Sequence, residues 1–249
     1  MSEKKILVCS GCSFTDNRWY SDFYPDLDTS WPKWPELLGE KYNMEVVNLG
    51  QSGAGNEYIY HSILDYLTDA PKEKIGLIIA AWSQSHRKDY QIGGRWRNER
   101  LDPHGDIYSH FNKTLRHYLS FQILCERYNL PYRQFQMIDP FNDFLNGLKP
   151  RDVDIISGKY KANEKLTEDL GKNNDNLEIL LKNIMWWERV INTKNFWGWP
   201  ISKHLNGMIM NNKLDKDLKV STFDSHPNKL GQQKIMEILY DWLGPRIPS

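Results

Sequence analysis

The sequence predicts an α/β fold in which a mostly parallel sheet carries helices on both faces. Short apolar segments rich in β-branched residues alternate with longer segments of helical periodicity along the 249 residues. Such alternation is typical of parallel strands joined by crossover helices. The candidate strands are nearly continuous apolar runs, as expected for strands buried on both faces. Ligands bind sheets of this kind at the carboxyl ends of the strands.

In the first half of the chain, β-branched apolar runs and amphipathic periodicity define the elements. The expected strands are residues 4–9, 45–49 and 74–82, and the expected helices are residues 34–42 and 57–67. In the second helix, Ile59, Ile63 and Leu67 share one face. Residues 84–105 are polar and rich in arginine with no clear period, so no element is expected there.

The second half continues the alternation after one interruption. The expected elements are helices over 107–128, 177–191 and 227–243 and a strand over 131–138. Residues 195–200 are either a last strand or a loop at the rim. Residues 142–176 are charged, polar and rich in Gly and Asn, which indicates an insertion over the surface. We therefore expect a single domain over residues 1–249 with this one insertion.

Composition excludes several classes of protein. Lys and Arg total 32 and Asp and Glu total 32, so a general nucleic-acid or anionic-membrane binder is not expected. No apolar run approaches the roughly 20 residues that span a bilayer, and the N-terminus lacks the apolar stretch of a signal peptide. A soluble, cytoplasmic protein is expected. Three cysteines give no disulfide framework, and no spacing of ligands predicts a metal site.

The first candidate for chemistry is Ser13, which lies in the turn after the first expected strand. A hydroxyl on a tight turn between strand and helix is exposed and surrounded by backbone N–H groups that can hold an oxyanion. A serine after a glycine in such a turn is more often a cap or turn residue. Ser13 alone therefore indicates little.

The second candidate is the segment FDSHPN at residues 223–228, just before the last expected helix. His226 there is a candidate general base, and Asp224 could fix its tautomer and stabilise the imidazolium. The alternative is that Ser225 or Asp224 only helps to start the helix, with Pro227 near its first turn.

Four short segments, in order, resemble the conserved blocks of the SGNH (GDSL-like) hydrolase superfamily. GCSFT at 11–15 resembles the nucleophile block, and NLGQSG at 48–53 resembles the glycine block, with Gly53 where the family points an N–H into the oxyanion hole. AWSQ at 81–84 stands where the family has Gly-x-Asn-Asp, and DSHPN at 224–228 resembles the acid–histidine block. The resemblance spans residues 6–243 and implies a three-layer, flavodoxin-like fold.

The resemblance also implies a serine esterase that needs no cofactor. Ser13 would be the nucleophile, His226 the base and Asp224 the acid that orients it, with the N–H groups of Ser13 and Gly53 at the oxyanion. The expected substrate is a small-molecule or carbohydrate ester, with an O-acetyl carbohydrate favoured by the many aromatic and arginine residues. Arg87, near Arg95, Trp96 and Arg97, could contact an anionic or sugar-like substrate through stacking and bidentate bonds.

Two positions depart from the family pattern. Ser83 replaces the Asn that donates to the oxyanion; Ser83 itself is the first candidate for this role, and Asn56, Gln84 or Arg87 could substitute for it. The usual acid lies three residues before the histidine, whereas Asp224 lies two before His226. In an extended segment these two side chains share a face but do not obviously pair through Nδ1. Either the local turn differs, or a backbone carbonyl orients the ring in a Ser–His dyad.

Two other interpretations stay open. Cys9 and Cys12 form a CxxC after a strand, which is a pattern of thioredoxin-like redox sites. The departures at Ser83 and Asp224 also fit a binding or structural protein of a larger assembly that keeps the fold without its catalysis. The distance between Ser13 Oγ and His226 Nε2 separates this alternative from an esterase.

Overall fold

The computed structural model describes the chain except residues 1–3, 101, 103, 141–173, 203–204 and 247–249. Its main sheet has the strand order β2-β1-β3-β6-β7, and every neighbouring pair is parallel. The strands are β1 (Ile6–Ser10), β2 (Glu45–Asn48), β3 (Ile75–Trp82), β6 (Tyr132–Gln136) and β7 (Phe196–Trp197). The prediction of a mostly parallel sheet is confirmed, and residues 195–200 contain a two-residue strand at its edge.

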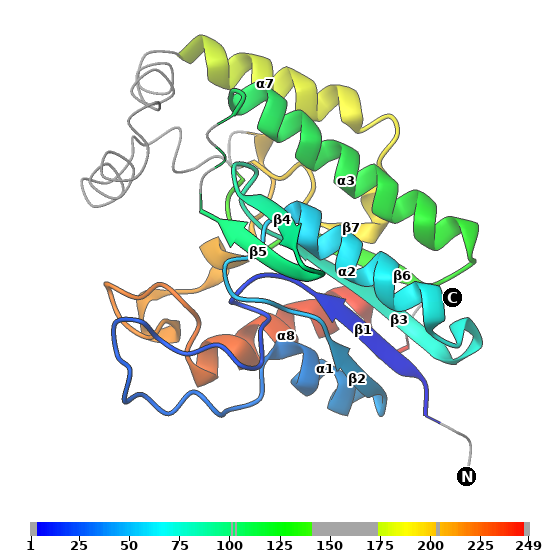
Figure 1. Cartoon of the computed structure of the whole chain (residues 1–249), viewed down its shortest axis with the longest axis vertical. Coiled ribbons are helices and arrows are strands. Elements are labelled where there is room, and N and C mark those ends of the chain that lie inside the picture. Colours follow the sequence, from blue (N-terminus) through cyan, green and yellow to red (C-terminus); the bar gives the residue numbers. More distant parts are fainter. Residues whose placement is uncertain (1–3, 101, 103, 141–173, 203–204, 247–249) are drawn as a thin grey trace.

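Helices cover both faces of this sheet (Figure 1). Helices α1 (Trp34–Tyr42) and α8 (Lys229–Leu243) pack together on one face, and α2 (Asn56–Asp69) and α3 (Ile107–Arg127) pack together on the other, with α7 (Asn174–Trp187) against α3. Short 3₁₀ helices are Lys72–Lys74, Thr193–Asn195, Met210–Lys213 and Lys216–Leu218. The three-layer α/β architecture that the sequence predicts is thus confirmed.

Local chemistry explains where the later helices begin. Asp106 caps α3 by accepting a hydrogen bond of 2.7 Å from the Ser109 N–H, and Asn228 caps α8 by accepting one of 3.0 Å from the Gly231 N–H. Both caps satisfy an N–H that the helix itself leaves unpaired. Because Asn228 follows His226 by two residues, the start of α8 also fixes the position of the candidate base.

The expectation that residues 84–105 hold no element is wrong. Strands β4 (Lys88–Ile92) and β5 (Arg95–Glu99) form an antiparallel hairpin, joined by Gly93 and Gly94 with φ of 57° and 71°. Two consecutive residues with positive φ make the type of tight turn that matches the twist of paired strands. The Gly-Gly pair was a signal for this turn. Arginine and polar residues hid the strands because only one face of the hairpin is covered.

Two further expectations concern the insertion and membrane-spanning helices. The expected insertion at 142–176 lies outside the described residues except for 174–176, which begin α7. Among the helices of the described part, none is long and apolar enough to cross a membrane.

Candidate active site

The nucleophile candidate lies on a tight turn at the carboxyl end of β1. The N–H groups of Thr15 and Asp16 both donate to the Cys12 carbonyl, at 2.8 and 3.1 Å, and close the turn around Ser13. A Cβ at Gly11 would lie 2.2 Å from the Thr15 hydroxyl oxygen, so the turn requires a glycine there. Ser13 is 8% exposed. Its hydroxyl is therefore held in a fixed position on a nearly buried turn.

Ser13, His226 and Asp224 form a continuous chain of hydrogen bonds. His226 Nε2 lies 2.8 Å from Ser13 Oγ, and His226 Nδ1 lies 2.6 Å from Asp224 Oδ1. Both distances are those of a nucleophile, a base and an orienting acid poised for proton transfer. The three side chains come from opposite ends of the chain, across 213 residues between Ser13 and His226.

The two-residue spacing of acid and base works because the chain turns locally. The His226 N–H donates to the carboxylate of Asp224 at 3.1 Å, and the Ser221 N–H donates to the Asp224 carbonyl at 3.1 Å. The first of these bonds makes an Asx turn, in which the carboxylate folds back onto the residue two positions later. The same carboxylate oxygen then reaches the imidazole Nδ1. The sequence left open either a different local turn or a Ser–His dyad oriented by a backbone carbonyl. The structure has the local turn, with Asp224 bonded to His226.

Asp224 is buried but remains an anion. It is 2% exposed, and its second oxygen accepts a hydrogen bond of 2.5 Å from the hydroxyl of Ser21. Burial alone would raise the pKa of Asp224, but hydrogen bonds from the side chains of His226 and Ser21 and from the His226 N–H outweigh it and lower the pKa below its ordinary value. A carboxylate is thus fixed beside the base, and Ser21, which the sequence did not single out, is one of its anchors.

Replacing Ser21 by alanine is expected to lower kcat for ester hydrolysis by about tenfold, with little change in KM. A hydrogen bond to a charged group contributes about 1.5–3 kcal/mol, and only part of it bears on the orientation of His226. Steady-state kinetics of Ser21→Ala and Ser21→Thr check this, because threonine keeps the hydroxyl and should restore most of kcat. Equal losses in the two variants would mean that Ser21 only supports packing.

Two aromatic rings hold the imidazole of His226 in place. Trp19 stacks on it with ring centroids 4.6 Å apart and an interplanar angle of 30°, and Phe14 lies 5.0 Å away at 42°. Trp19 therefore limits rotation of the imidazole and keeps its Nε2 directed at Ser13.

The glycine loop after β2 is tied to the nucleophile turn. The Gln51 N–H donates to the Gly11 carbonyl at 3.0 Å, and both the N–H and the hydroxyl of Ser52 donate to the buried carboxylate of Asp16 at 2.8 Å. Gly53 has φ of 79°, and a Cβ there would lie 2.4 Å from the amide oxygen of Asn98. Within the described residues, the N–H groups of Ser13 and Gly53 donate to no protein acceptor. Both can therefore serve an oxyanion.

The prediction that the Ser83 side chain donates to an oxyanion is wrong. Ser83 is 0% exposed, and its hydroxyl is buried without a partner among the described residues. Its N–H donates to the Asn56 amide oxygen at 2.7 Å, and its carbonyl accepts from the side chains of Asn56 and Gln136. These bonds hold the end of β3 inside the protein. The buried Ser83 hydroxyl therefore does not reach a substrate.

The expectation that Asn56 binds the substrate, as a substitute for Ser83 at the oxyanion, is corrected for a related reason. Asn56 is 4% exposed. Its amide nitrogen donates to the Ser83 carbonyl at 3.2 Å and to the Thr114 hydroxyl at 3.0 Å, so both of its N–H groups are used. Asn56 instead joins the start of α2 to β3 and α3.

Arg87 is half-buried and braces the loops at the rim. Its guanidinium donates to the Gln84 side chain at 3.1 Å and to the Ala54 carbonyl at 3.0 Å. Arg87 therefore fixes the residue after Gly53 relative to the loop after β3. A contact with substrate through Arg87 stays a prediction, as does a donor role for Gln84.

The β4–β5 hairpin is anchored on this glycine loop. The buried Asp89 accepts hydrogen bonds of 2.9 Å from the N–H groups of Gly55 and Tyr58, at the N-terminus of α2, and Asn98 donates to the Ser52 carbonyl at 3.2 Å. A carboxylate is favourable at a helix N-terminus because it satisfies unpaired N–H groups and the helix dipole. The hairpin thus supports Gly53.

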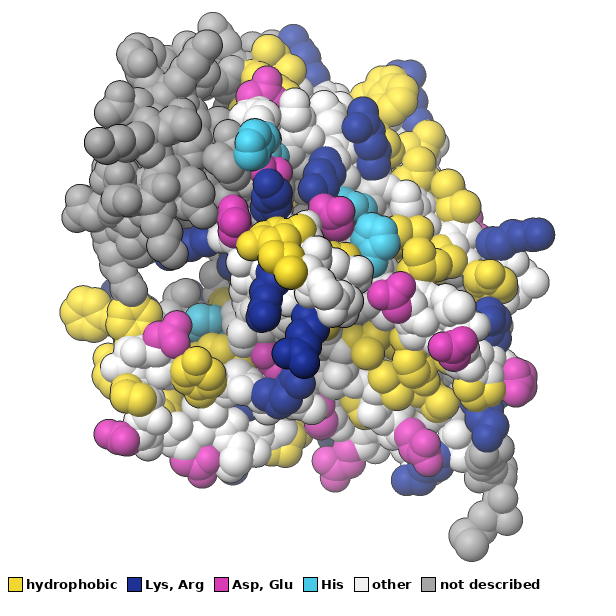
Figure 2. All heavy atoms as spheres, viewed as in Figure 1, with side chains coloured by type: hydrophobic (Ala, Val, Ile, Leu, Met, Phe, Trp, Pro, Cys, Tyr) yellow, Lys and Arg dark blue, Asp and Glu magenta, His cyan; other side chains and the backbone are white. Residues whose placement is uncertain are grey.

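The arginines of the hairpin do not act together with Trp96. Arg95 and Arg97 are exposed, whereas Trp96 packs edge-on against Tyr58 with ring centroids 5.5 Å apart. Side chains alternate between the two faces of a strand, so the expected joint surface of tryptophan and arginines is split. Figure 2 shows Lys and Arg side chains running down the middle of the face that carries the hairpin.

The redox interpretation of the CxxC pattern is wrong. Cys9 and Cys12 are free and fully buried. Burial, with a smaller effect of the Glu36 charge, raises the pKa of the Cys9 thiol well above its ordinary value. Redox-active cysteines need an accessible thiolate with a lowered pKa, and these two thiols are core residues instead.

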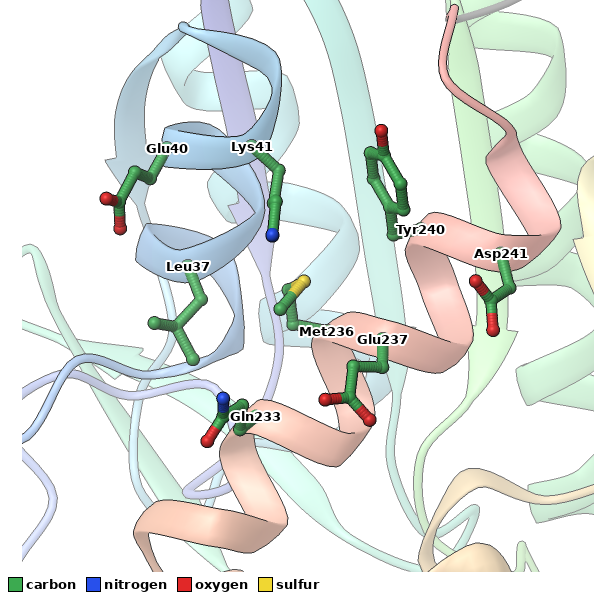
Figure 3. A pocket seen from close by; sticks show the side chains of 8 residues that line it. All are labelled: Leu37, Glu40, Lys41, Gln233, Met236, Glu237, Tyr240 and Asp241. Atoms are coloured by element: carbon green, nitrogen blue, oxygen red, sulfur yellow. The ribbon is translucent and has the colours of Figure 1, made fainter.

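Two surface hollows are relevant to ligand binding. One, of about 510 Å³, lies between α1 and α8, where Lys41 faces Met236 and Tyr240 (Figure 3). None of its lining residues belongs to the triad. The other, of about 560 Å³, lies between residues 23–27 and residues 220–221, beside Asp224. Among the described residues, no group of three or more His, Cys, Asp or Glu side chains could hold a metal ion.

Comparison with known proteins gives matches among solved structures. No family model and no curated protein matches the chain. A G-D-S-L family protein from Desulfitobacterium hafniense is 16% identical, with a TM-score of 0.47, over 96% of this chain and 100% of that one. The psychrotrophic esterase EstA from Pseudoalteromonas is 13% identical, with a TM-score of 0.46, over 96% and 97%. The lipase Lip_vut3 from a goat rumen metagenome is 12% identical, with a TM-score of 0.46, over 96% and 97%.

These and another similar structure are described as a G-D-S-L family protein, an SGNH hydrolase, an esterase and a lipase. They match nearly the whole chain.

Proposed function

We propose that the protein is a serine ester hydrolase. The observation that supports this most strongly is the hydrogen-bonded chain from Ser13 Oγ through both nitrogens of His226 to Asp224, at 2.8 and 2.6 Å. A serine without a catalytic role does not require a base within hydrogen-bond distance, nor a buried carboxylate that orients this base. The free N–H groups of Ser13 and Gly53 supply the oxyanion donors that acyl transfer requires.

The reaction proceeds through an acyl-enzyme. Ser13 Oγ attacks the carbonyl carbon of the ester while His226 Nε2 takes the hydroxyl proton. Asp224 stabilises the imidazolium, and the two backbone N–H groups stabilise the negative oxygen of the tetrahedral intermediate. His226 then gives its proton to the alcohol oxygen, and the C–O bond breaks. Water, activated by His226, hydrolyses the acyl-enzyme and restores Ser13.

We propose O-acetyl esters of carbohydrates as the substrate class. Trp19, Trp34 and Trp197 are each less than 8% exposed, so these three tryptophans pack inside the protein and offer no exposed platform for a sugar. Support comes instead from the exposed aromatic residues Tyr20, Phe23 and Tyr24, on the segment that contains Ser21, the hydrogen-bond partner of Asp224. The near-complete burial of Ser13, which is 8% exposed, also favours a small acyl group.

A catalytically impaired binding protein is the second candidate, and Ser83 favours it. Because the hydroxyl of Ser83 is buried, Ser83 does not complete the set of oxyanion donors with its side chain. Loss of one such donor lowers rates by about 10²–10³-fold. An enzyme that relies on two backbone N–H groups alone would be slow, and a binding protein would have no need of the third donor.

Covalent labelling by a fluorophosphonate distinguishes the two candidates. We expect a stoichiometric phosphonyl adduct on Ser13, mapped by mass spectrometry, which disappears in Ser13→Ala and becomes very slow in His226→Ala. Ser225→Ala is the matched control, because Ser225 is an exposed hydroxyl next to the base in sequence. Its adduct should equal that of the wild type. A folded wild-type protein without an adduct would contradict the esterase and favour the binding protein.

A further inference from the structure

The glycine loop that follows β2 makes a tight turn over residues 51–54. The Ala54 N–H donates to the Gln51 carbonyl at 3.1 Å, which closes a four-residue β-turn. The third residue of the turn, Gly53, has φ of 79°, whereas the second, Ser52, does not have a positive φ. A closed turn with a positive φ at its third residue alone is of type II.

The central peptide of this turn carries the candidate oxyanion donor. It consists of the Ser52 carbonyl and the Gly53 N–H, which point in opposite directions because the peptide is planar and trans. Turns of types I and II differ in the orientation of this central peptide, which is rotated by roughly half a turn between them. A glycine at the third position accepts both conformations. The turn alone therefore does not determine where the Gly53 N–H points.

Asn98 of β5 holds the carbonyl end of the central peptide. Its amide nitrogen donates to the Ser52 carbonyl at 3.2 Å. Its amide also covers the Cα of Gly53, since a Cβ there would lie 2.4 Å from the Asn98 amide oxygen. Because the carbonyl faces Asn98, the Gly53 N–H is directed away from the hairpin. A flipped peptide would lose the bond to Asn98 and turn its N–H toward the hairpin.

The other peptides of the loop are held independently of Asn98. The Ser52 N–H donates to the Asp16 carboxylate at 2.8 Å, and the Ala54 carbonyl accepts from the Arg87 guanidinium at 3.0 Å. These bonds keep the loop beside the nucleophile turn but do not fix the orientation of the central peptide. Among the described residues, Asn98 is the side chain that hydrogen-bonds to this peptide.

We infer that Asn98 is a positioning residue, which holds the Ser52–Gly53 peptide in the orientation that presents the Gly53 N–H to the oxyanion. The inference rests on the proposed esterase function, in which this N–H stabilises the tetrahedral intermediate. A hydrogen bond to the carbonyl also polarises the peptide and makes its N–H a stronger donor. Asn98 lies outside the four segments that resemble the family blocks, so the β4–β5 hairpin contributes to the reaction from another part of the chain.

Two replacements of Asn98 test this role. Asn98→Ala removes the donor and most of the side chain, whereas Asn98→Leu keeps a side chain of similar size without a donor. Both should lower kcat for a soluble acetate ester by about tenfold and leave KM within about threefold, because a misdirected N–H affects the tetrahedral intermediate more than the bound ester. Gln91→Leu, which removes an exposed amide from β4 of the same hairpin, is the matched control and should retain wild-type kcat.

A double-mutant cycle tests whether Asn98 acts through Gly53. Gly53→Ala should lower kcat by about 10²-fold, because a side chain disfavours the positive φ of the type II turn and meets the Asn98 amide. Adding Asn98→Ala to this variant should lower kcat no further, since the N–H is already misdirected. Thermal unfolding of each variant checks that the protein stays folded.

The possible outcomes separate the role of Asn98 from the function on which it rests. Losses that multiply in the double variant, or wild-type kcat in Asn98→Leu, would overturn the positioning role while the esterase stands. A folded wild-type protein that neither hydrolyses the ester nor becomes labelled at Ser13 would overturn both.

Discussion

Replacing His226 by alanine is expected to lower kcat for ester hydrolysis by about four orders of magnitude, with KM within about threefold of wild type. In the structure, His226 Nε2 is the group within hydrogen-bond distance of Ser13 Oγ, at 2.8 Å. Without it, the serine must attack as a neutral hydroxyl and the alcohol must leave without a proton. Removal of one residue of a catalytic triad abolishes most of the rate enhancement that the three residues provide together. Initial rates on a soluble acetate ester measure the loss.

His104→Ala is the matched control for this experiment. His104 also lies next to a carboxylate, with Nδ1 3.4 Å from Asp102, but its side chain is 79% exposed. Its removal should leave kcat unchanged. Added imidazole should partly restore the rate of His226→Ala, because a free base can enter the space left beside Ser13. A rate for His226→Ala within tenfold of wild type would show that another group activates the serine.

The sheet and the nucleophile turn could be predicted because their signals are local. In β1 and β3, nearly every residue is apolar and buried, so a continuous apolar run was enough to identify them. Gly11 and Ser13 follow β1 directly, and a turn at the carboxyl end of a parallel strand belongs to the ligand-binding edge. The position of Ser13 therefore followed from its neighbours in sequence.

The geometry around Asp224 could not be predicted because its causes are distant in sequence. The acid is held by Ser21, which lies 203 residues away, and by an Asx turn that an extended reading of the segment excludes. The two-residue spacing to His226 therefore looked unfavourable although the pair is 2.6 Å apart. This turn requires Ser21 and Ser221 each to accept and to donate hydrogen bonds at the same time. The sequence of residues 223–228 does not reveal these partners.

The side chain of Ser83 shows a second limit. Its place after β3 suggested the rim, and the strand does end there. Its hydroxyl is nevertheless buried without a partner among the described residues, while Asn56 of α2 and Gln136 of β6 bind its backbone groups. Whether a residue at a strand end faces the rim or the core is decided by such partners on neighbouring elements. The pattern of residues 81–84 contains no information on them.

Replacing Asp224 by asparagine is expected to lower kcat by about 10³–10⁴-fold while the protein stays folded. Asparagine keeps the shape, but its amide can present an N–H to His226 Nδ1 and so favour the tautomer that cannot accept the Ser13 proton. The loss should exceed that of Ser21→Ala, since Ser21 acts on His226 only through Asp224. Asp102→Asn, which changes the carboxylate of the other His–Asp pair, is the control and should retain wild-type kcat.

The pH dependence of stability gives a second readout for the same variant. Because the folded protein lowers the pKa of Asp224 below its unfolded value, the carboxylate stabilises the fold fully above the unfolded pKa, and this contribution is lost as pH falls through the folded pKa. Thermal unfolding of Asp224→Asn should therefore depend less on pH between about 4 and 2 than that of wild type. Near-normal turnover in Asp224→Asn, with this change in stability present, would mean that the carboxylate supports the loop and that His226 is oriented without it.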